Sequence, residues 1–367
     1  MLITCKEKLE NYTVKKHLWL GIPSIEVTKK GRVFITFYSG GAKEQIGNYV
    51  LLIKADDGVH FSEPVAAAYE EGHRCFDPCL WMDPLGRLWF TWARYPDDGV
   101  FGVVCDDPDA EELVWSEERL LGHNIMMNKP TVFSTGEWAF PIAAWADGVC
   151  AGSLENNVPN APGAYTYVST DEGKTLGMRG GAQVANRSFD EHMILEMKDG
   201  TLRTYVRTNY GIGYAVSRDG GKTWVESEEE RIEGPSARFF IRRLPSGRIL
   251  LVHHADTKER NNLTAMLSDD EGKTFPHRLL LDPRQSVSYP DCAVRGGTLH
   301  ICYDRERGAF CKNAQAALSQ AREILYSRIT EEDILAGGIV GGESFLGRVA
   351  YKLREYDGDA DALFEEN

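Results

Sequence analysis

The sequence has no run of apolar residues long enough to cross a bilayer, because no window approaches about 18 consecutive apolar positions. The first residues, MLITCKEKLENYTVKKHLWLG, carry charges from Lys6 to Glu10, where a secretory signal would have an apolar core. The eight cysteines show no paired metal-ligand spacing. These absences predict a cytoplasmic protein with reduced thiols, no metal site and no membrane partner.

Basic residues are also in deficit, since 41 Lys and Arg face 55 Asp and Glu, a formal net charge of −14. This excess of acid disfavours nucleic acid as a partner, because its phosphates would be repelled. It leaves room for a locally basic pocket that binds a small ligand. The segments GGAKEQIG near Gly40 and DGDAD at 357–361 lack the spacing of a phosphate loop and a calcium loop, so no cofactor is expected.

What the sequence does contain is repetition. The box Ser-x-Asp-x-Gly-x-Thr, followed by a large apolar residue, occurs at 169–176, 217–224 and 268–275, with a partial copy at 54–61. An aspartate that accepts backbone N–H groups, a left-handed glycine and a locally bonded threonine hydroxyl would make each box a self-stapled hairpin turn. We therefore interpret the boxes as folding elements, with the apolar residue tucked into the sheet.

Six segments share a further plan of strand, glycine-bearing turn and strongly apolar strand. Their matching positions are Pro23, Pro78, Pro130, Met193, Phe239 and Pro290. The spacing of 46 to 63 residues suits a four-stranded propeller blade, whereas a β-sandwich has no reason to repeat six times. The repeat predicts an all-β fold, a six-bladed β-propeller of four-stranded antiparallel blades. It would form a single domain over residues 1–350, followed by an acidic tail at 351–367.

Near the end of this domain, we expect a short helix after Ala316, a strand at EILYSRIT and a short capped helix at TEEDILAG.

The innermost strand of each blade lines the axis of a propeller, and its first residues point toward one mouth of the channel. Many of these residues are polar here: Arg74, Asp77, Asn128, Lys129, Asp190, Glu191, His192, Arg238, Tyr289 and Asp291. A purely structural channel would favour small or apolar side chains. We therefore predict a binding or catalytic mouth at this end of the channel.

This six-unit plan with its boxes resembles the sialidase superfamily of six-bladed propellers, the BNR or Asp-box proteins, from Gly21 to about Gly337. The resemblance implies that Tyr289 in SYPD is a nucleophile, that Glu191 polarises it and that Arg207 in TYVRT grips a substrate carboxylate. The chemistry is reasonable, because a phenol with a pKa near ~10 is a poor nucleophile at neutral pH unless a neighbouring carboxylate takes its proton.

The sequence departs from the family pattern at two places. Gly21 stands where the family has its first arginine, before Ile-Pro. The loop expected to carry an acid/base aspartate offers Glu44 instead, which we take as the first choice for the acid, with Asp77 as the second. Arg238 is our candidate for the remaining arginine.

The predicted function is exo-acting glycoside hydrolysis of short glycans or single glycosides, with a carbohydrate as the partner. Arg74 and Lys129 are extra cations that favour an anionic or polyhydroxylated sugar. Because Gly21 replaces the first family arginine, ordinary sialic acid is less favoured, and a uronate, a sialic-acid relative and a neutral sugar all remain open. Asn128, Asp190, His192 and Asp291 are further predicted substrate-binding residues.

Two other functions are left open. One is a uronate-specific lyase, in which Tyr289 or His192 would abstract a proton. The other is a carbohydrate-binding propeller without activity.

Overall fold

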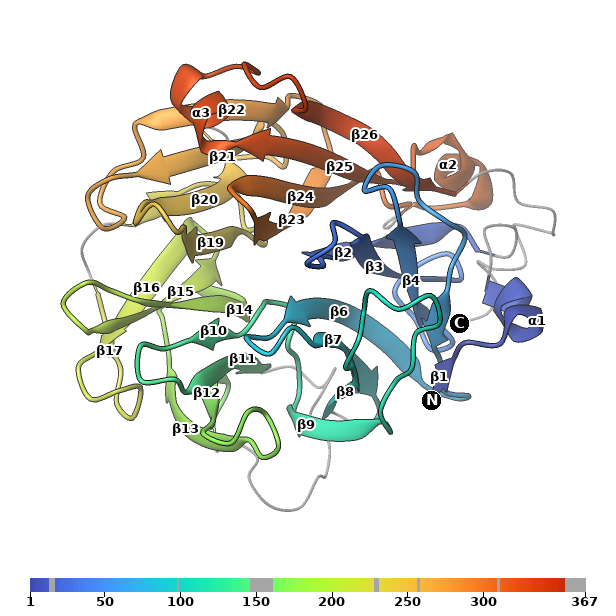
Figure 1. Ribbon diagram of the computed structural model, residues 1–367, viewed down its shortest axis with the longest axis horizontal. Helices are drawn as coiled ribbons and strands as arrows, with labels where there is room; N and C mark the ends of the chain where they lie inside the picture. Colours follow the sequence, from blue (N-terminus) through green and yellow to red (C-terminus); the bar gives the residue numbers. More distant parts are fainter. Residues whose placement is uncertain are drawn as a thin grey trace.

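The computed structural model describes residues 1–12, 17–97, 99–145, 161–227, 231–255, 258–308 and 311–353. Six antiparallel sheets are arranged around a central axis, with the chain passing from one blade to the next in sequence order (Figure 1). This confirms the predicted all-β, six-bladed propeller.

The strands of each blade run in order from the axis outwards. The first three blades consist of β2 (Trp19–Val27), β3 (Val33–Gly40), β4 (Tyr49–Ala55) and β5 (Ala66–Ala68); β6 (Arg74–Met82), β7 (Leu88–Tyr95), β8 (Gly99–Cys105) and β9 (Arg119–His123); and β10 (Thr131–Val132), β11 (Trp138–Ala144), β12 (Gly163–Ser169) and β13 (Gly177–Ala182). The other three consist of β14 (Arg187–Glu196), β15 (Leu202–Thr208), β16 (Gly211–Ser217) and β17 (Val225–Glu226); β19 (Phe240–Arg243), β20 (Ile249–His254), β21 (Leu263–Ser268) and β22 (His277–Asp282); and β23 (Val287–Arg295), β24 (Thr298–Arg305), β25 (Glu323–Thr330) and β26 (Phe345–Lys352).

Two short strands extend this plan. β1 (Leu2–Ile3) pairs with β5 at the outer edge of the first blade, and β18 (Ile232–Glu233) pairs with β16. The predicted acidic tail begins within β26, and residues 354–367 lie outside the described part of the chain.

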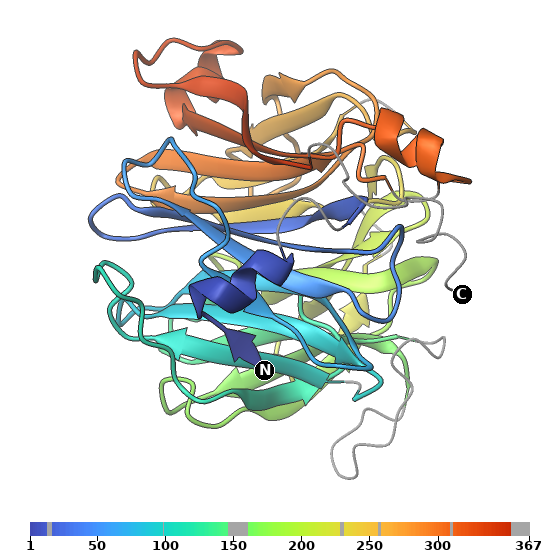
Figure 2. The same cartoon turned by 90° about the vertical axis from the view of Figure 1, so that its right-hand side faces the viewer.

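The described helices are short: α1 (Lys6–Leu9), a 3₁₀ turn (Glu10–Tyr12), α2 (Ala314–Ser319) and α3 (Glu331–Ala336). The last two confirm the helices expected near the C-terminal end, and Thr330 caps α3 in a reciprocal capping box. In side view α2 and α3 lie toward opposite faces of the ring (Figure 2).

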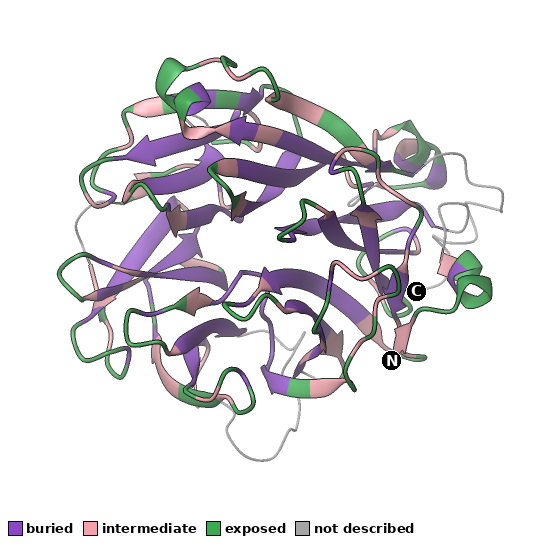
Figure 3. Cartoon of the chain, in the orientation of Figure 1, coloured by how far each residue is buried: buried purple, intermediate pink, exposed green. Residues whose placement is uncertain are grey.

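The hydrophobic core lies between neighbouring blades, because each sheet packs both of its faces. Trp81 and Trp89 of the second blade, for example, pack against Trp138 and Phe140 of the third. The strands are therefore largely buried, while the turns at their ends are exposed (Figure 3). With both faces packed, the polar residues that remain on the inner strands gather around the axis.

The three complete boxes form the turns between the third and fourth strands of their blades, as predicted. In the first box, the Asp171 carboxylate accepts bonds from the backbone N–H of Thr175 at 2.9 Å and from its hydroxyl at 2.7 Å. Gly173 has a φ of 81°, and the following Leu176 packs against the core. The boxes contribute no residue to the pocket described below, which agrees with a folding role.

Candidate active site

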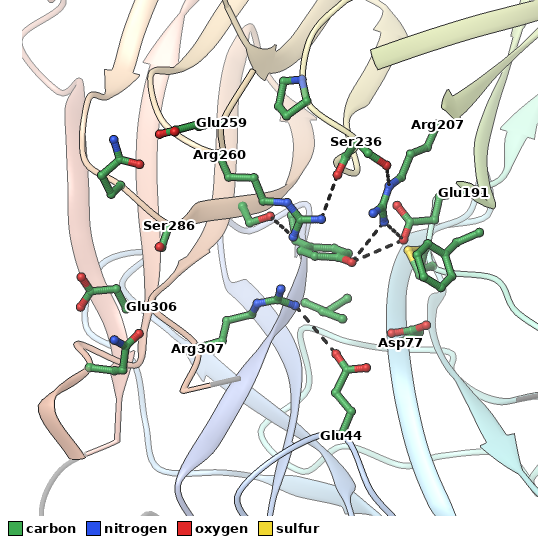
Figure 4. Close-up of a pocket in the computed structure, with 18 of the residues that line it drawn as sticks. Glu44, Asp77, Glu191, Arg207, Ser236, Glu259, Arg260, Ser286, Glu306 and Arg307 are labelled. Atoms are coloured by element: carbon green, nitrogen blue, oxygen red, sulfur yellow. Dashed lines mark hydrogen bonds and ion pairs between the residues drawn. The ribbon is translucent and has the colours of Figure 1, made fainter. Parts of the chain in front are cut away.

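A pocket of about 670 Å³ lies where the inner strands of several blades converge (Figure 4). Several predicted site residues line it: Glu44, Arg74, Asp77, Glu191, Arg207 and Tyr289. Trp145 and Phe189 form an apolar part of its wall, with ring centroids 5.2 Å apart. The pocket thus combines carboxylates, guanidinium groups and aromatic rings, a composition suited to a sugar.

Interruptions in the inner strands aim side chains into this pocket. The pairing register shifts in β2, β6, β14 and β23, where the residues with positive φ include Ile22, Asp77, Asp190 and Tyr289. In three of these strands, the next residue is a proline, which has no N–H to continue the ladder. A bulge of this kind re-aims a side chain that regular alternation would place elsewhere.

Tyr289 and Glu191 lie at the centre of the pocket, together with Arg207. The Tyr289 hydroxyl donates to Glu191 Oε1 at 3.4 Å, and Arg207 Nη1 donates to the same carboxylate oxygen at 2.8 Å. Burial raises the pKa of Tyr289, and the Glu191 charge adds to this, although neighbouring arginines oppose it. The phenol therefore holds its proton at neutral pH and needs a base to become a nucleophile. The Glu191 carboxylate lies where such a base would be needed.

Arg207, Arg260 and Arg307 surround Tyr289. The guanidinium carbons of Arg260 and Arg307 lie 5.5 Å and 4.8 Å from the Tyr289 ring centroid. Arg260 is held by Ser288 Oγ at 3.1 Å and by the Ser236 carbonyl at 3.0 Å. The resulting concentration of positive charge would favour an anionic ligand.

Arg260 and Arg307 escaped the sequence analysis, because they lie on loops beyond strand ends and no strand register points to them. The only available signal was their charge within otherwise polar loops.

Two further carboxylates reach the pocket, in different electrostatic settings. Glu44 forms an ion pair with Arg74 at 3.0 Å and lies 4.0 Å from Arg307, so its carboxylate faces two guanidinium groups. Asp77 is buried, and this burial raises its pKa to about 8; the Arg74 charge opposes the shift, while Glu44 and Glu191 add to it. Asp77 therefore keeps a proton at neutral pH.

Comparison with known proteins places this arrangement in a family. Residues 32–301 match the family described as the BNR repeat-like domain. The chain belongs to this family. A sialidase from Bacteroides fragilis (strain YCH46) is 32% identical over 145 residues, a match that spans 36% of this chain but only 26% of that protein.

Solved structures are similar in fold. The Hadza microbial sialidase Hz136 has a TM-score of 0.65 and 18% identity, covering 86% of this chain and 66% of that one. The intramolecular trans-sialidase from Ruminococcus gnavus, in complex with oseltamivir carboxylate, has a TM-score of 0.63 and 13% identity, covering 87% and 96%. Fold and family together identify a divergent sialidase-like protein.

Four residues predicted to bind substrate lie in the channel of this BNR repeat-like protein without lining the pocket: Asn128, Lys129, Arg238 and Asp291. Lys129 Nζ lies 3.0 Å from both Glu26 and Asp291 and donates to two backbone carbonyls. Asp291 also accepts from the Ser24 hydroxyl and the Ile25 N–H, which joins the last blade to the first. Their contacts are therefore with the fold.

Arg238, which the sequence offered as an arginine for the substrate, bonds instead to Asn128 Oδ1 at 2.8 Å and to the Met127 carbonyl at 2.6 Å. The alternation of side chains along a strand could not predict these contacts, because Arg238 precedes β19, the first strand of its blade. We leave Arg238 and Asn128 out of the proposed substrate contacts.

His192 and Asp190 also lie beside the pocket rather than on its wall. The two ring nitrogens of His192 face the backbone oxygens of Asp190 and Tyr165, each at 2.8 Å. Asp190 pairs with Arg187 at 3.1 Å. His192 is thus occupied by the backbone, which disfavours its predicted use as the base of a lyase.

The described residues contain no group of three or more His, Cys, Asp or Glu side chains placed to hold a metal ion. Among the same residues, no helix has the length and apolar character needed to cross a membrane.

Replacing Lys129 by methionine is expected to destabilise the fold by about 3–5 kcal/mol, because it leaves the buried Glu26 and Asp291 charges uncompensated. Urea unfolding would measure the change. A matched control is Lys198→Met, which removes an exposed ion pair with Glu271 and should cost less than about 1 kcal/mol. Equal effects of the two substitutions would contradict the structural role of Lys129.

Proposed function

We propose that this protein is an exo-acting glycoside hydrolase that removes a terminal sugar carrying a carboxylate. The observation that carries the proposal is the contact of Tyr289 with Glu191, inside a pocket that four arginines also line, together with the protonated Asp77. Each of these groups has a role in cleaving a glycosidic bond. The 32% identity of 145 residues to a sialidase supports the same reaction class.

In the proposed reaction, the phenolic oxygen of Tyr289 forms a bond to the anomeric carbon while the bond to the departing oxygen breaks. Glu191 accepts the phenol proton, and Asp77 gives its proton to the departing oxygen. Water then attacks the anomeric carbon and loses its proton to the Asp77 carboxylate. Glu191 returns a proton to the Tyr289 oxygen as it leaves, so both side chains recover their starting states.

Exo action is supported by what lies next to the pocket. Arg238 and Lys129 are fully buried with their partners in the channel, and Arg238 bonds directly to the backbone of Met127 on the pocket wall. A glycan could not be threaded through these packed side chains. The pocket would accept only the end of a chain, with the carboxylate toward the arginines.

A panel of 4-methylumbelliferyl glycosides tests the proposal. We expect turnover of the α-glycoside of N-acetylneuraminic acid or of the glucuronide, and little turnover of neutral glucosides and galactosides, because only the acids can pair with the arginines. The rates would be followed by fluorescence. A preference for neutral sugars would contradict the acidic substrate.

Two further assays separate the other two functions. With an oligosaccharide whose uronate carries another sugar on O4, loss of the C5 proton and of the O4 substituent would give an unsaturated uronate that absorbs in the near ultraviolet, which would indicate a lyase. Tight binding of a glycan without any turnover would indicate a non-catalytic propeller.

A further inference from the structure

Gly21 lies in β2 at the edge of the pocket, and its lack of a side chain has a spatial cause. A Cβ atom at this position would lie 2.8 Å from Cγ of Arg307, closer still to its Cδ, and 2.9 Å from Asp304 Oδ2. The φ of Gly21 is outside the left-handed region, so the backbone conformation does not require glycine here. The missing side chain instead makes room for Arg307.

Arg307 reaches this space from the loop after β24, in the last blade, whereas Gly21 belongs to the first. Its side chain is only 10% exposed, lines the pocket and lies 3.8 Å from the fully buried Asp304. Asp304 also accepts the Ile22 N–H at 2.8 Å, so one carboxylate fixes both the bulge of β2 and the arginine. Arg307 is therefore held in place from two blades.

The Nη1 atom of Arg307 is buried and has no hydrogen-bond partner among the described residues. Its loose ion pair with Glu44, at 4.0 Å, does not satisfy this donor. A buried, unpaired guanidinium N–H is costly, and an acceptor in the pocket would remove that cost. The adjacent guanidinium groups make a carboxylate the fitting acceptor.

We propose that Gly21 and Arg307 are a complementary pair that determines selectivity for a carboxylated sugar: Gly21 leaves the space, and Arg307 fills it with a donor to the sugar carboxylate. This inference rests on the proposed function and deepens it. According to this proposal, Arg307 of the last blade can occupy its place only because Gly21 of the first blade has no side chain. The pair therefore acts as a unit, which makes it testable by exchange.

The experiment measures binding in a Tyr289→Phe background, in which the ligand is not turned over. The probes are N-acetylneuraminic acid and glucuronic acid, each paired with its neutral methyl ester, and the readout is the acid-to-ester affinity ratio by calorimetry. Arg307→Ala should lower this ratio by about 10- to 100-fold, since a charged hydrogen bond is lost. Gly21→Ala should lower it in the same direction, because its Cβ displaces Arg307.

The exchange variant, Gly21→Arg with Arg307→Gly, should recover at least tenfold of the ratio relative to Arg307→Ala. Arg328→Ala is the matched control: it lies in the same blade but pairs with Glu343 at 3.6 Å outside the pocket, and it should leave the ratio unchanged. Melting curves would establish that all variants are folded.

Three results would overturn the inference: no preference of the parent protein for either acid over its ester, equal losses for acid and ester in Arg307→Ala, or no recovery in the exchange variant. Failure of the proposed function would look different. A protein that binds an acid through Arg307 yet never cleaves its glycosides would refute hydrolysis while retaining the pair.

Discussion

Tyr289→Phe is expected to lower turnover by at least about 10³-fold while the substrate still binds. The change removes only the hydroxyl that lies 3.4 Å from Glu191 and leaves the ring between Arg260 and Arg307. Substrate affinity should therefore change little, because the arginines are retained. Steady-state rates with the best aryl glycoside of the panel, together with calorimetric binding of the free sugar, would separate the two effects.

Glu191→Gln should cause a loss of similar order, because burial raises the pKa of Tyr289 and the phenol then has no base. If the two residues act as one unit, the double variant should be no slower than the slower single variant. Losses that multiply would instead indicate separate roles for the two residues.

A matched control is Tyr303→Phe in the same blade. It removes a buried hydrogen bond to Asp282 at 3.1 Å, and Tyr303 does not line the pocket. We expect a modest loss of stability, about 1 kcal/mol, and unchanged turnover. A Tyr289→Phe variant within tenfold of the parent rate would exclude the phenol as nucleophile and leave the carboxylates to act alone.

The fold was predictable from sequence because the six-unit repeat and its boxes are local patterns, and each local turn sets the register of its own blade. Tyr289, Glu191 and Asp77 were found by the same register. Lys129 and Asp291 occupy similar sequence positions but bond to the fold, because the bulges decide which neighbour faces the pocket. No periodicity in the sequence encodes that choice.

The arginines show a second limit of sequence analysis. Gly21 was interpreted as a missing positive charge, whereas Arg307 brings a charge into that space from the opposite end of the chain. Proximity between the first and last blades follows from closure of the ring, and the sequence does not show which loop side chain will fill a gap. Arg260 was missed for the same reason.

The choice between Glu44 and Asp77 as the acid also depends on tertiary structure. Asp77 was predicted at the mouth and Glu44 on the loop expected to carry the acid, and the sequence favoured Glu44. Only the fold reveals that Glu44 is paired with Arg74 while Asp77 is buried and protonated at neutral pH. An acid must carry its proton at the working pH, so Asp77 becomes the first choice in the proposed mechanism.

Asp77→Asn should lower kcat/KM by about 10²- to 10⁴-fold for glycosides with a poor leaving group, such as an alkyl or sugar alcohol. The loss should be much smaller for a dinitrophenyl glycoside, because its leaving group departs without a proton. Since asparagine resembles the protonated carboxyl that is native below about pH 8, the variant should fold. Glu44→Gln is the matched control, and it should affect both kinds of leaving group to the same extent.

The pH profile gives an independent measure of the same group. A pKa of about 8 means that Asp77 loses its proton as the pH rises through that value, so kcat/KM of the parent protein for a poor leaving group should fall above pH 8, approaching tenfold per unit. This alkaline decline should be absent in Asp77→Asn and retained in Glu44→Gln. The reverse pattern would identify Glu44 as the acid, as the sequence alone had suggested.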